Sequence, residues 1–181
     1  MGHLAAISYS RSKNELELQK VLELQKRNIR QVLSSEELRS EGFVTVVHDL
    51  DLLKKMQQFC PHILAKKGEE IVGYALAMVP DFREEIPILV PLFELTDRLL
   101  PDSKYLVMGQ ICIDKSFRGK GIFSQMYRYY RDQLHTTYDC LVTEVSSDNQ
   151  RSLQAHLHVG FEHLYTHVEN KEEWITLVWN W

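Results

Sequence analysis

The sequence has a turn with two glycines and two basic side chains directly after an apolar stretch. Residues 111–123 read ICIDKSFRGKGIF, so a predicted strand passes through Gly119 and Gly121 into a predicted helix. Glycines at such a turn let backbone N–H groups converge on one point, and a helix N-terminus adds partial positive charge. The chemistry favoured here is anion binding, and a pyrophosphate would suit the site.

Two common phosphate-binding loops do not fit this turn. A Walker A loop needs Ser or Thr after Gly-Lys, whereas Gly121 follows Gly119-Lys120 here. A dinucleotide-binding fingerprint needs a last glycine where Ser124 stands. Taken alone, the turn could equally be a solvated loop with incidental basic side chains.

A second segment lies about 30 residues further along the chain. Residues 144–161 read EVSSDNQRSLQAHLHVGF, and with this segment the sequence resembles the GNAT superfamily of acyl-CoA-dependent N-acyltransferases. The glycine motif of that family, R/Q-x-x-G-x-G/A, is matched at Arg118 and Gly121 and departs from the pattern at Phe123. The second motif, N-x-x-[AS]-x-x-x-[YH]-x-x-x-G-F, is matched at Asn149, Ser152, His156, Gly160 and Phe161.

The resemblance implies that acetyl-CoA is the cosubstrate, held by the strand and turn described above. The backbone of Ile111 and Ile113 would pair with the pantetheine arm. Because the backbone amide of Phe123 remains available, we expect binding to survive with the pyrophosphate seated slightly differently. The residues that the resemblance assigns to cofactor binding are Ile111, Cys112, Ile113, Arg118, Gly119, Lys120, Gly121, Ile122, Phe123, Asn149 and Ser152.

Direct attack of an amine on the thioester requires a group that accepts the ammonium proton. Relatives often place Glu or His on the fourth strand, at the positions of Val107 and Gly109, which cannot titrate. Glu144 lies five residues before Asn149, where the ribosomal-protein N-terminal acetyltransferases carry a basic Glu. The resemblance therefore makes Glu144 the first candidate for the base, and a solvated or paired strand residue is the alternative.

A second group must return a proton to the leaving thiolate. His156 occupies the position where most members of the family have a proton-donating tyrosine, and a branch that resembles the phosphinothricin acetyltransferases has His there. An imidazole with a pKa near ~6.5 can donate to a thiolate whose thiol pKa is near ~8.5. The alternative is a structural helix histidine, and Tyr127, Tyr130 and Tyr165 are the other candidates for the acid.

Apolar periodicity, capping patterns and turn residues predict a mixed order of elements. The predicted strands are residues 4–9, 62–67, 71–79, 105–113, 140–145, 163–169 and 174–179. The predicted helices begin with a long one capped at Ser12 and continue with a short one after Ser34, then 49–59, 121–134 and 152–159.

This order is that of the GNAT fold. We expect a mixed α/β protein with a central sheet of about seven strands, splayed between strands 4 and 5 and flanked by helices. A single domain over residues 1–181 is expected, with an extra proline-broken segment at 81–100. That segment is predicted either to cover the acceptor site or to be a surface loop packed on the core.

Composition excludes several other classes. The chain has 181 residues and a formal net charge of −4, whereas nucleic-acid binders normally carry a basic surface. The apolar stretch at 86–100 is too short and too charged to span a bilayer, so no membrane role is expected. Three widely spaced cysteines predict neither disulfides nor a zinc site and fit the cytoplasm. The spacing of the C-terminal histidines also predicts no metal site.

The leading hypothesis is a cytoplasmic acetyl-CoA-dependent N-acetyltransferase. Its acceptor would be a primary amine of a small molecule or peptide that attacks in a ternary complex. The alternative from another class is a non-catalytic acyl-CoA-binding module or sensor, and a P-loop-like hydrolase comes third. Acidic residues at 81–97 hint at a cationic acceptor, although a carboxylate-bearing one is equally open. The tryptophans at the C-terminus fit a homodimer interface as well as a core edge.

Overall fold

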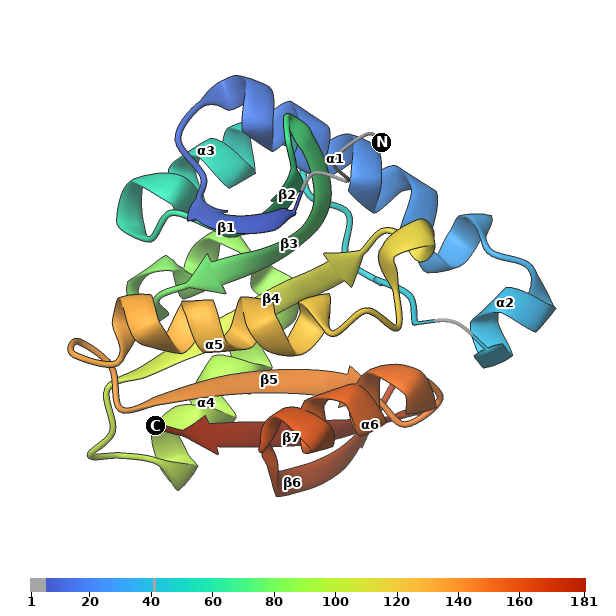
Figure 1. Cartoon of the computed structure of the whole chain (residues 1–181). Helices are drawn as coiled ribbons and strands as arrows, with labels where there is room; N and C mark the ends of the chain where they lie inside the picture. The colour runs from blue at the N-terminus through green and yellow to red at the C-terminus, as the bar shows by residue number, and fades with distance from the viewer. Residues whose placement is uncertain (1–5, 41) are drawn as a thin grey trace.

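The computed structural model describes residues 6–40 and 42–181, without the side chains of residues 38–40 and 88, and it shows a seven-stranded mixed sheet (Figure 1). The strand order is β1-β2-β3-β4-β5-β7-β6, and every neighbouring pair is antiparallel except β4 and β5, which are parallel. The strands are β1 (Ile7–Arg11), β2 (Ile63–Lys67), β3 (Glu70–Met78), β4 (Tyr105–Ile113), β5 (Cys140–Ser146), β6 (Glu162–Glu169) and β7 (Glu172–Asn180).

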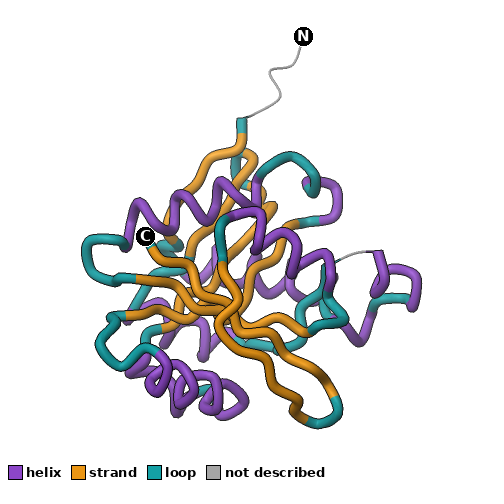
Figure 2. Tube along the Cα trace, turned by 90° about the horizontal axis from the view of Figure 1, so that it is seen from below, coloured by secondary structure: helices purple, strands orange, loops and turns teal. Residues whose placement is uncertain are grey.

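Helices cover both faces of the sheet, as Figures 1 and 2 show. The α-helices are α1 (Glu15–Asn28), α2 (Ser35–Ser40), α3 (Leu50–Phe59), α4 (Val90–Leu99), α5 (Ile122–Leu134) and α6 (Gln150–Val159). In the view of Figure 1, α5 and α6 lie in front of the sheet, and α1, α3 and α4 lie behind it. This arrangement confirms the predicted fold class.

The N-terminal helix begins two residues later than the sequence pattern predicts. Asn14, not Ser12, caps α1, because its side chain accepts a hydrogen bond from the Glu17 amide, while the Glu17 carboxylate accepts one from the Lys13 amide. The hydroxyl of Ser12 instead accepts a hydrogen bond from the His62 amide. Two Ser/Asn-x-x-Glu registers overlap here, and tertiary contact with β2 selects the second.

The extra segment is more regular than its prolines predict. It forms two 3₁₀ turns, η2 (Pro80–Glu85) and η3 (Pro87–Leu89), and then α4. Its prolines stand at the first positions of these elements, where a missing N–H costs nothing. The segment packs against the start of β4, where the Tyr105 hydroxyl donates to Asp97 at 2.6 Å.

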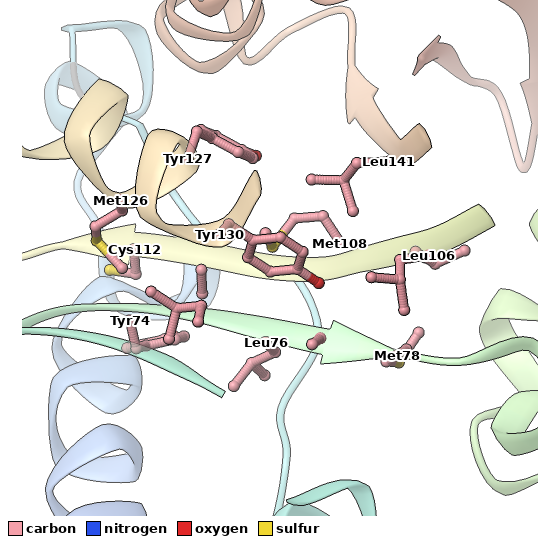
Figure 3. Packing of buried hydrophobic residues seen from close by; sticks show 14 of the residues in the cluster. Tyr74, Leu76, Met78, Leu106, Met108, Cys112, Met126, Tyr127, Tyr130 and Leu141 are labelled. Atoms are coloured by element: carbon pink, nitrogen blue, oxygen red, sulfur yellow. The ribbon is translucent and has the colours of Figure 1, made fainter. Parts of the chain in front are cut away.

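The core lies between the central strands and the helices on either side. Every residue of β3 except Glu70 is buried, which is typical of a strand covered on both faces. Tyr127 and Tyr130 of α5 are fully buried against β4, together with the apolar side chains that Figure 3 shows. The core therefore holds α5 against the sheet, and the start of α5 inherits that position.

The sheet opens between β4 and β5. The two strands pair only from Tyr105↔Cys140 to Val107↔Val142, although β4 continues to Ile113 and β5 to Ser146. Just beyond the last pair, the Thr143 hydroxyl donates to the Met108 carbonyl at 3.1 Å. After that bond, the two strands separate and leave their facing edges unpaired, as the sequence resemblance predicts.

Candidate functional site

A cavity of about 290 Å³ lies where β4 ends and α5 and α6 begin. It is lined by all of the residues predicted to bind the cofactor except Lys120 and Asn149. The lining residues that the sequence analysis did not single out are Gly42, Phe43, Val44, Phe117, Arg151 and Ala155. Two motifs about 30 residues apart in the sequence therefore form one cavity.

The glycine turn shapes the wall of this cavity at the start of α5. Gly119 and Gly121 have φ of +73° and +74°, in the left-handed region that favours glycine. Gly121 is the N-cap of α5, and no side chain caps the helix there. The first amides of α5 thus lack a side-chain partner at the cavity wall, an arrangement that suits an anion.

The two basic side chains of the turn make contacts within the protein. Arg118 donates to the Ile113 carbonyl at 3.0 Å and to the side-chain oxygen of Asn28 at 2.7 Å. Lys120 donates to the Ser116 carbonyl at 2.7 Å. Both side chains therefore brace the turn, and the basic side chain that lines the cavity from α6 is Arg151.

Asn149 holds the other side of the cavity together. Its side-chain oxygen caps α6 at the Ser152 amide, and its amide nitrogen donates to the Phe43 carbonyl at 3.1 Å. The segment at 42–48 is also tied to β4, because Gln110 donates to the Val46 carbonyl at 2.8 Å. Sequence reasoning missed this segment as a cavity wall, because no local pattern reveals bonds between residues 64 and 106 positions apart.

A second, smaller cavity of about 60 Å³ occupies the split between β4 and β5. It shares Phe43, Ile111 and Ser152 with the first cavity, so the two adjoin. Glu144 and His156 both line it. The structure thus brings the two predicted catalytic residues to one place.

Glu144 lies on β5 with its side chain only 15% exposed. Its Oε1 atom accepts a hydrogen bond from the Thr176 hydroxyl at 3.2 Å and lies 3.7 Å from Nδ1 of His167. Burial raises the pKa of the Glu144 carboxyl, and the nearby His167 opposes that rise. A carboxylate of raised basicity at a cavity suits a group that accepts protons.

His156 is buried, and both of its ring nitrogens are hydrogen-bonded. Nδ1 lies 2.7 Å from the Ser152 carbonyl, which only accepts, so Nδ1 carries the proton. Nε2 therefore accepts from the Tyr127 hydroxyl at 2.7 Å. Burial lowers the pKa of His156 to about 4, so the ring is neutral near pH 7. A role as proton donor stays a prediction, and this geometry disfavours it.

The unusual Phe123 accounts for part of this environment. Its ring packs edge-on against His156 and Tyr127, each with centroids 5.1 Å apart. These rings continue into an aromatic cluster with Phe161 and Trp179. The larger side chain at the third motif position thus belongs to the packing that seals His156.

The other candidates lie elsewhere. Tyr130 is fully buried in the core, and Tyr165 is 40% exposed on β6. No described residue of 81–100 lines either cavity, so a cover over the acceptor site stays a prediction that the position of α4 does not favour. Cys112 lines the first cavity, and burial raises its pKa to about 12.

Within residues 6–40 and 42–181, no three His, Cys, Asp or Glu side chains gather in a way that could hold a metal ion. None of the described helices combines the length and the apolar character needed to cross a bilayer.

Comparison with known proteins gives one family and one fold. Residues 20–161 match the family model described as Acetyltransferase (GNAT) family. No curated protein matches the sequence.

Solved structures of similar fold include three informative examples. The ribosomal-protein-S18-alanine N-acetyltransferase from Escherichia coli has a TM-score of 0.67 at 11% identity, over 97% of this chain and 94% of that one. A putative acetyltransferase from Salmonella typhimurium, solved with acetyl-CoA, has a TM-score of 0.62 at 13% identity, over 97% and 94%. A mutant agmatine N-acetyltransferase in its apo form has a TM-score of 0.69 at 13% identity, over 97% and 99%. At these identities, the likeness shows the shared fold.

Proposed function

The chain belongs to the GNAT acetyltransferase family, and on that premise we propose that it transfers the acetyl group of acetyl-CoA to a primary amine of a small molecule or peptide. The observation that carries this proposal is the pair of adjoining cavities. One places an uncapped helix start beside the open edge of β4, and the other places a buried carboxylate in the strand split.

The first cavity fits the cofactor. The amides at the start of α5 would bind the pyrophosphate, and Arg151 would add positive charge from the other wall. Beyond Val107, the edge of β4 lacks a β5 partner, and we propose that backbone groups of Ile111 and Ile113 pair there with the pantetheine amides. The solved neighbour that contains acetyl-CoA supports this assignment.

The second cavity fits the reaction. Glu144 would accept the proton that the ammonium group must lose before it attacks, directly or through a water molecule. Backbone N–H groups of β4 in the split would stabilise the charge that develops on the thioester oxygen.

We propose that His156 has a structural role while the CoA thiolate leaves and takes up a proton. A neutral imidazole with its proton held by a carbonyl is a weak acid, whereas a thiolate whose thiol pKa is ~8.5 is already a good leaving group. His156 would therefore keep Tyr127 and Phe123 in place, and the thiolate would take its proton from solvent. A near-normal kcat in His156→Phe would support this structural role. A loss of about 10²-fold or more in kcat would instead indicate that His156 is the general acid.

The acceptor class follows from the neighbours only by analogy. Their names give an alanine of ribosomal protein S18 and agmatine, which is a primary amine, as acceptors. For this chain, we propose that Glu144 gives the acceptor end of the split a negative charge that favours a cationic amine. The three free, buried cysteines agree with the cytoplasm as the proposed location.

One observation favours the second candidate function, a sensor that binds acyl-CoA without turnover. The cofactor cavity is well formed, whereas the described lining of the smaller cavity offers one carboxylate, Glu144, and one imidazole, His156, whose pKa burial lowers to about 4. A screen of amines, amino acids and peptides for release of free CoA thiol from acetyl-CoA separates the two functions. Acceptor-dependent release supports the transferase, and tight CoA binding without any release supports the sensor.

A further inference from the structure

His167 on β6 has a buried ring nitrogen without a hydrogen-bond partner. Its Nδ1 atom is inaccessible to solvent and lies 3.7 Å from Oε1 of Glu144, slightly beyond hydrogen-bond distance. Buried polar atoms in proteins are nearly always bonded, so an exception calls for an explanation. The carboxylate that lies 3.7 Å from this nitrogen is that of the proposed base itself.

The strand order places this pair between the smaller cavity and the edge of the sheet. Glu144 is opposite Thr176 on β7, and Tyr165 of β6 is opposite Thr176 from the other side. The Glu144 side chain lines the cavity at 15% exposure, whereas that of His167 lies outside the cavity lining at 26% exposure, on the outermost strand. The order of groups from cavity to solvent is therefore Glu144 and then His167.

The ring of His167 is also held in orientation. It stacks on Tyr165 with centroids 6.3 Å apart and planes at 23°. The Thr176 hydroxyl fixes the facing carboxylate by its bond to Oε1. The carboxylate is thus held by a bond from β7, and the ring is held by stacking within β6.

We propose that His167 carries the proton of each turnover from Glu144 to solvent. The ammonium N–H bond breaks as an O–H bond forms on Glu144. The O–H bond then breaks as Nδ1 of His167 takes the proton, and the imidazolium releases its other proton from Nε2 to water. The carboxylate is restored, and the ring is left neutral with its proton on Nδ1. Exchange of the ring protons with water returns the proton to Nε2 before the next turnover, and no further reactant is needed. This inference rests on the proposed function, and because His167 reaches the acceptor only through Glu144, it is a positioning residue.

The burial of Glu144 is the physical reason why its proton needs a route to solvent. A carboxyl whose pKa is raised by burial holds its proton longer, and it must lose that proton before the next acceptor binds. Glu169, at the end of β6, adds to the rise, while His167 opposes it. On β7, Glu172 is already engaged with Arg30 at 2.6 Å. Among the groups that perturb Glu144, His167 is the one whose ring carries both a nitrogen facing the carboxylate and a second nitrogen.

The first test needs no acceptor. The titration of His167 is followed by NMR in histidine-labelled protein and in the Glu144→Gln variant. Removing the carboxylate that lies 3.7 Å from Nδ1 should lower the His167 midpoint. An unchanged midpoint overturns the pairing, and with it the proposal, whether or not the chain is an acetyltransferase.

The second test is kinetic and uses acetyl-CoA with agmatine and with an alanine-starting peptide as probes. His167→Ala should lower kcat about 10-fold or more with little change in the KM for acetyl-CoA, and added imidazole should restore part of the rate. The matched control is His163→Ala, because His163 lies on the same strand, lines neither cavity and bonds to Thr166 at 2.7 Å. It should keep the wild-type kcat.

The outcomes separate the two claims. If the wild-type protein acetylates neither probe nor any amine in the screen, the proposed function fails, and the NMR titration still decides the pairing. If the wild-type protein is active and His167→Ala is equally active, the relay is wrong. A loss of kcat that imidazole does not restore, at equal folded fraction, also overturns the relay, since a purely structural role predicts that result.

Discussion

Replacing Gly121 with alanine should separate backbone strain from ligand binding. Gly121 has φ of +74°, and a Cβ atom built there meets nothing within 4 Å. The substitution therefore adds no steric clash, but it forces an L-residue into the left-handed region. That conformation costs about 1–2 kcal/mol per residue. For a chain of this size, the expected loss is roughly 2–8 °C in Tm.

The effect on the cofactor should be larger than the strain alone. The new methyl group would stand at the cavity wall where the pyrophosphate approaches the α5 amides. Pushing the phosphate away from one such amide removes a hydrogen bond to a charged group, worth about 1.5–3 kcal/mol. CoA affinity should therefore fall by roughly 10-fold to 150-fold. Gly121→Glu, which adds a negative charge, should abolish binding.

The chain supplies a matched control at the β2–β3 turn. Gly68 has φ of +60°, and a Cβ atom there also meets nothing within 4 Å. Gly68→Ala thus carries similar strain but lies outside both cavities. It should lower Tm by a similar amount and leave CoA affinity unchanged.

The assays are calorimetric titration with CoA and thermal unfolding without ligand, each on the wild-type protein and both variants. The reasoning is refuted if Gly121→Ala loses Tm as expected but binds CoA as tightly as the wild-type protein. Such a result would show that the helix start does not contact the cofactor. Equal losses of affinity in the two variants would refute it as well, because they would trace the effect to strain.

Three other predictions concern the buried titratable groups. Glu144→Gln should lower kcat by roughly 10²–10⁴-fold at unchanged acetyl-CoA affinity. Because the pKa of Glu144 is raised, wild-type activity should fall as the pH drops through that pKa, which gives the pH profile an acidic limb. The variant should lose this limb, and a limb that remains would contradict the assignment. Tyr127→Phe leaves Nε2 of His156 buried without its donor, so urea unfolding should show a loss of about 1–3 kcal/mol, and unchanged stability would contradict that bond. Burial lowers the pKa of His48, His62 and His156 to about 4, below the ordinary value near 6.5. The unfolded chain thus binds more protons between these values, and the urea midpoint should fall as pH is lowered from 6.5 toward 4, whereas a flat midpoint would show that these rings are accessible.

The sequence predicted the parts of the fold that local chemistry determines. Helix α5 and strand β4 begin and end within one residue of their expected limits, because strong apolar periodicity and the glycine turn define them. The predicted cap of α1, Ser12, was wrong because two overlapping capping patterns compete, and contact with β2 decides which of them forms. Helix α4 was missed because its prolines were interpreted as breakers, although they stand at starts of elements.

The same limit applies to the candidate site. The two motifs predicted most of the first cavity, since residue types and spacing define them directly. The wall at 42–48 and the contacts of His156 depend on bonds between distant elements, such as Asn149 to Phe43, which no local pattern encodes. The pairing of Glu144 with His167 depends on the register of three strands. Side-chain position across a sheet is a tertiary property, and only the structure supplies it.

The measurement that tests the central claim most directly follows the acetyl group itself. Acetyl-CoA labelled with ¹³C in the acetyl group is incubated with the protein and a panel of primary amines, and both products are analysed by mass spectrometry. Acetyl transfer predicts labelled N-acetylated amine in equal amount to free CoA, with both lost in Glu144→Gln. Free CoA with labelled acetate alone, or bound acetyl-CoA that remains intact with every amine, would contradict it.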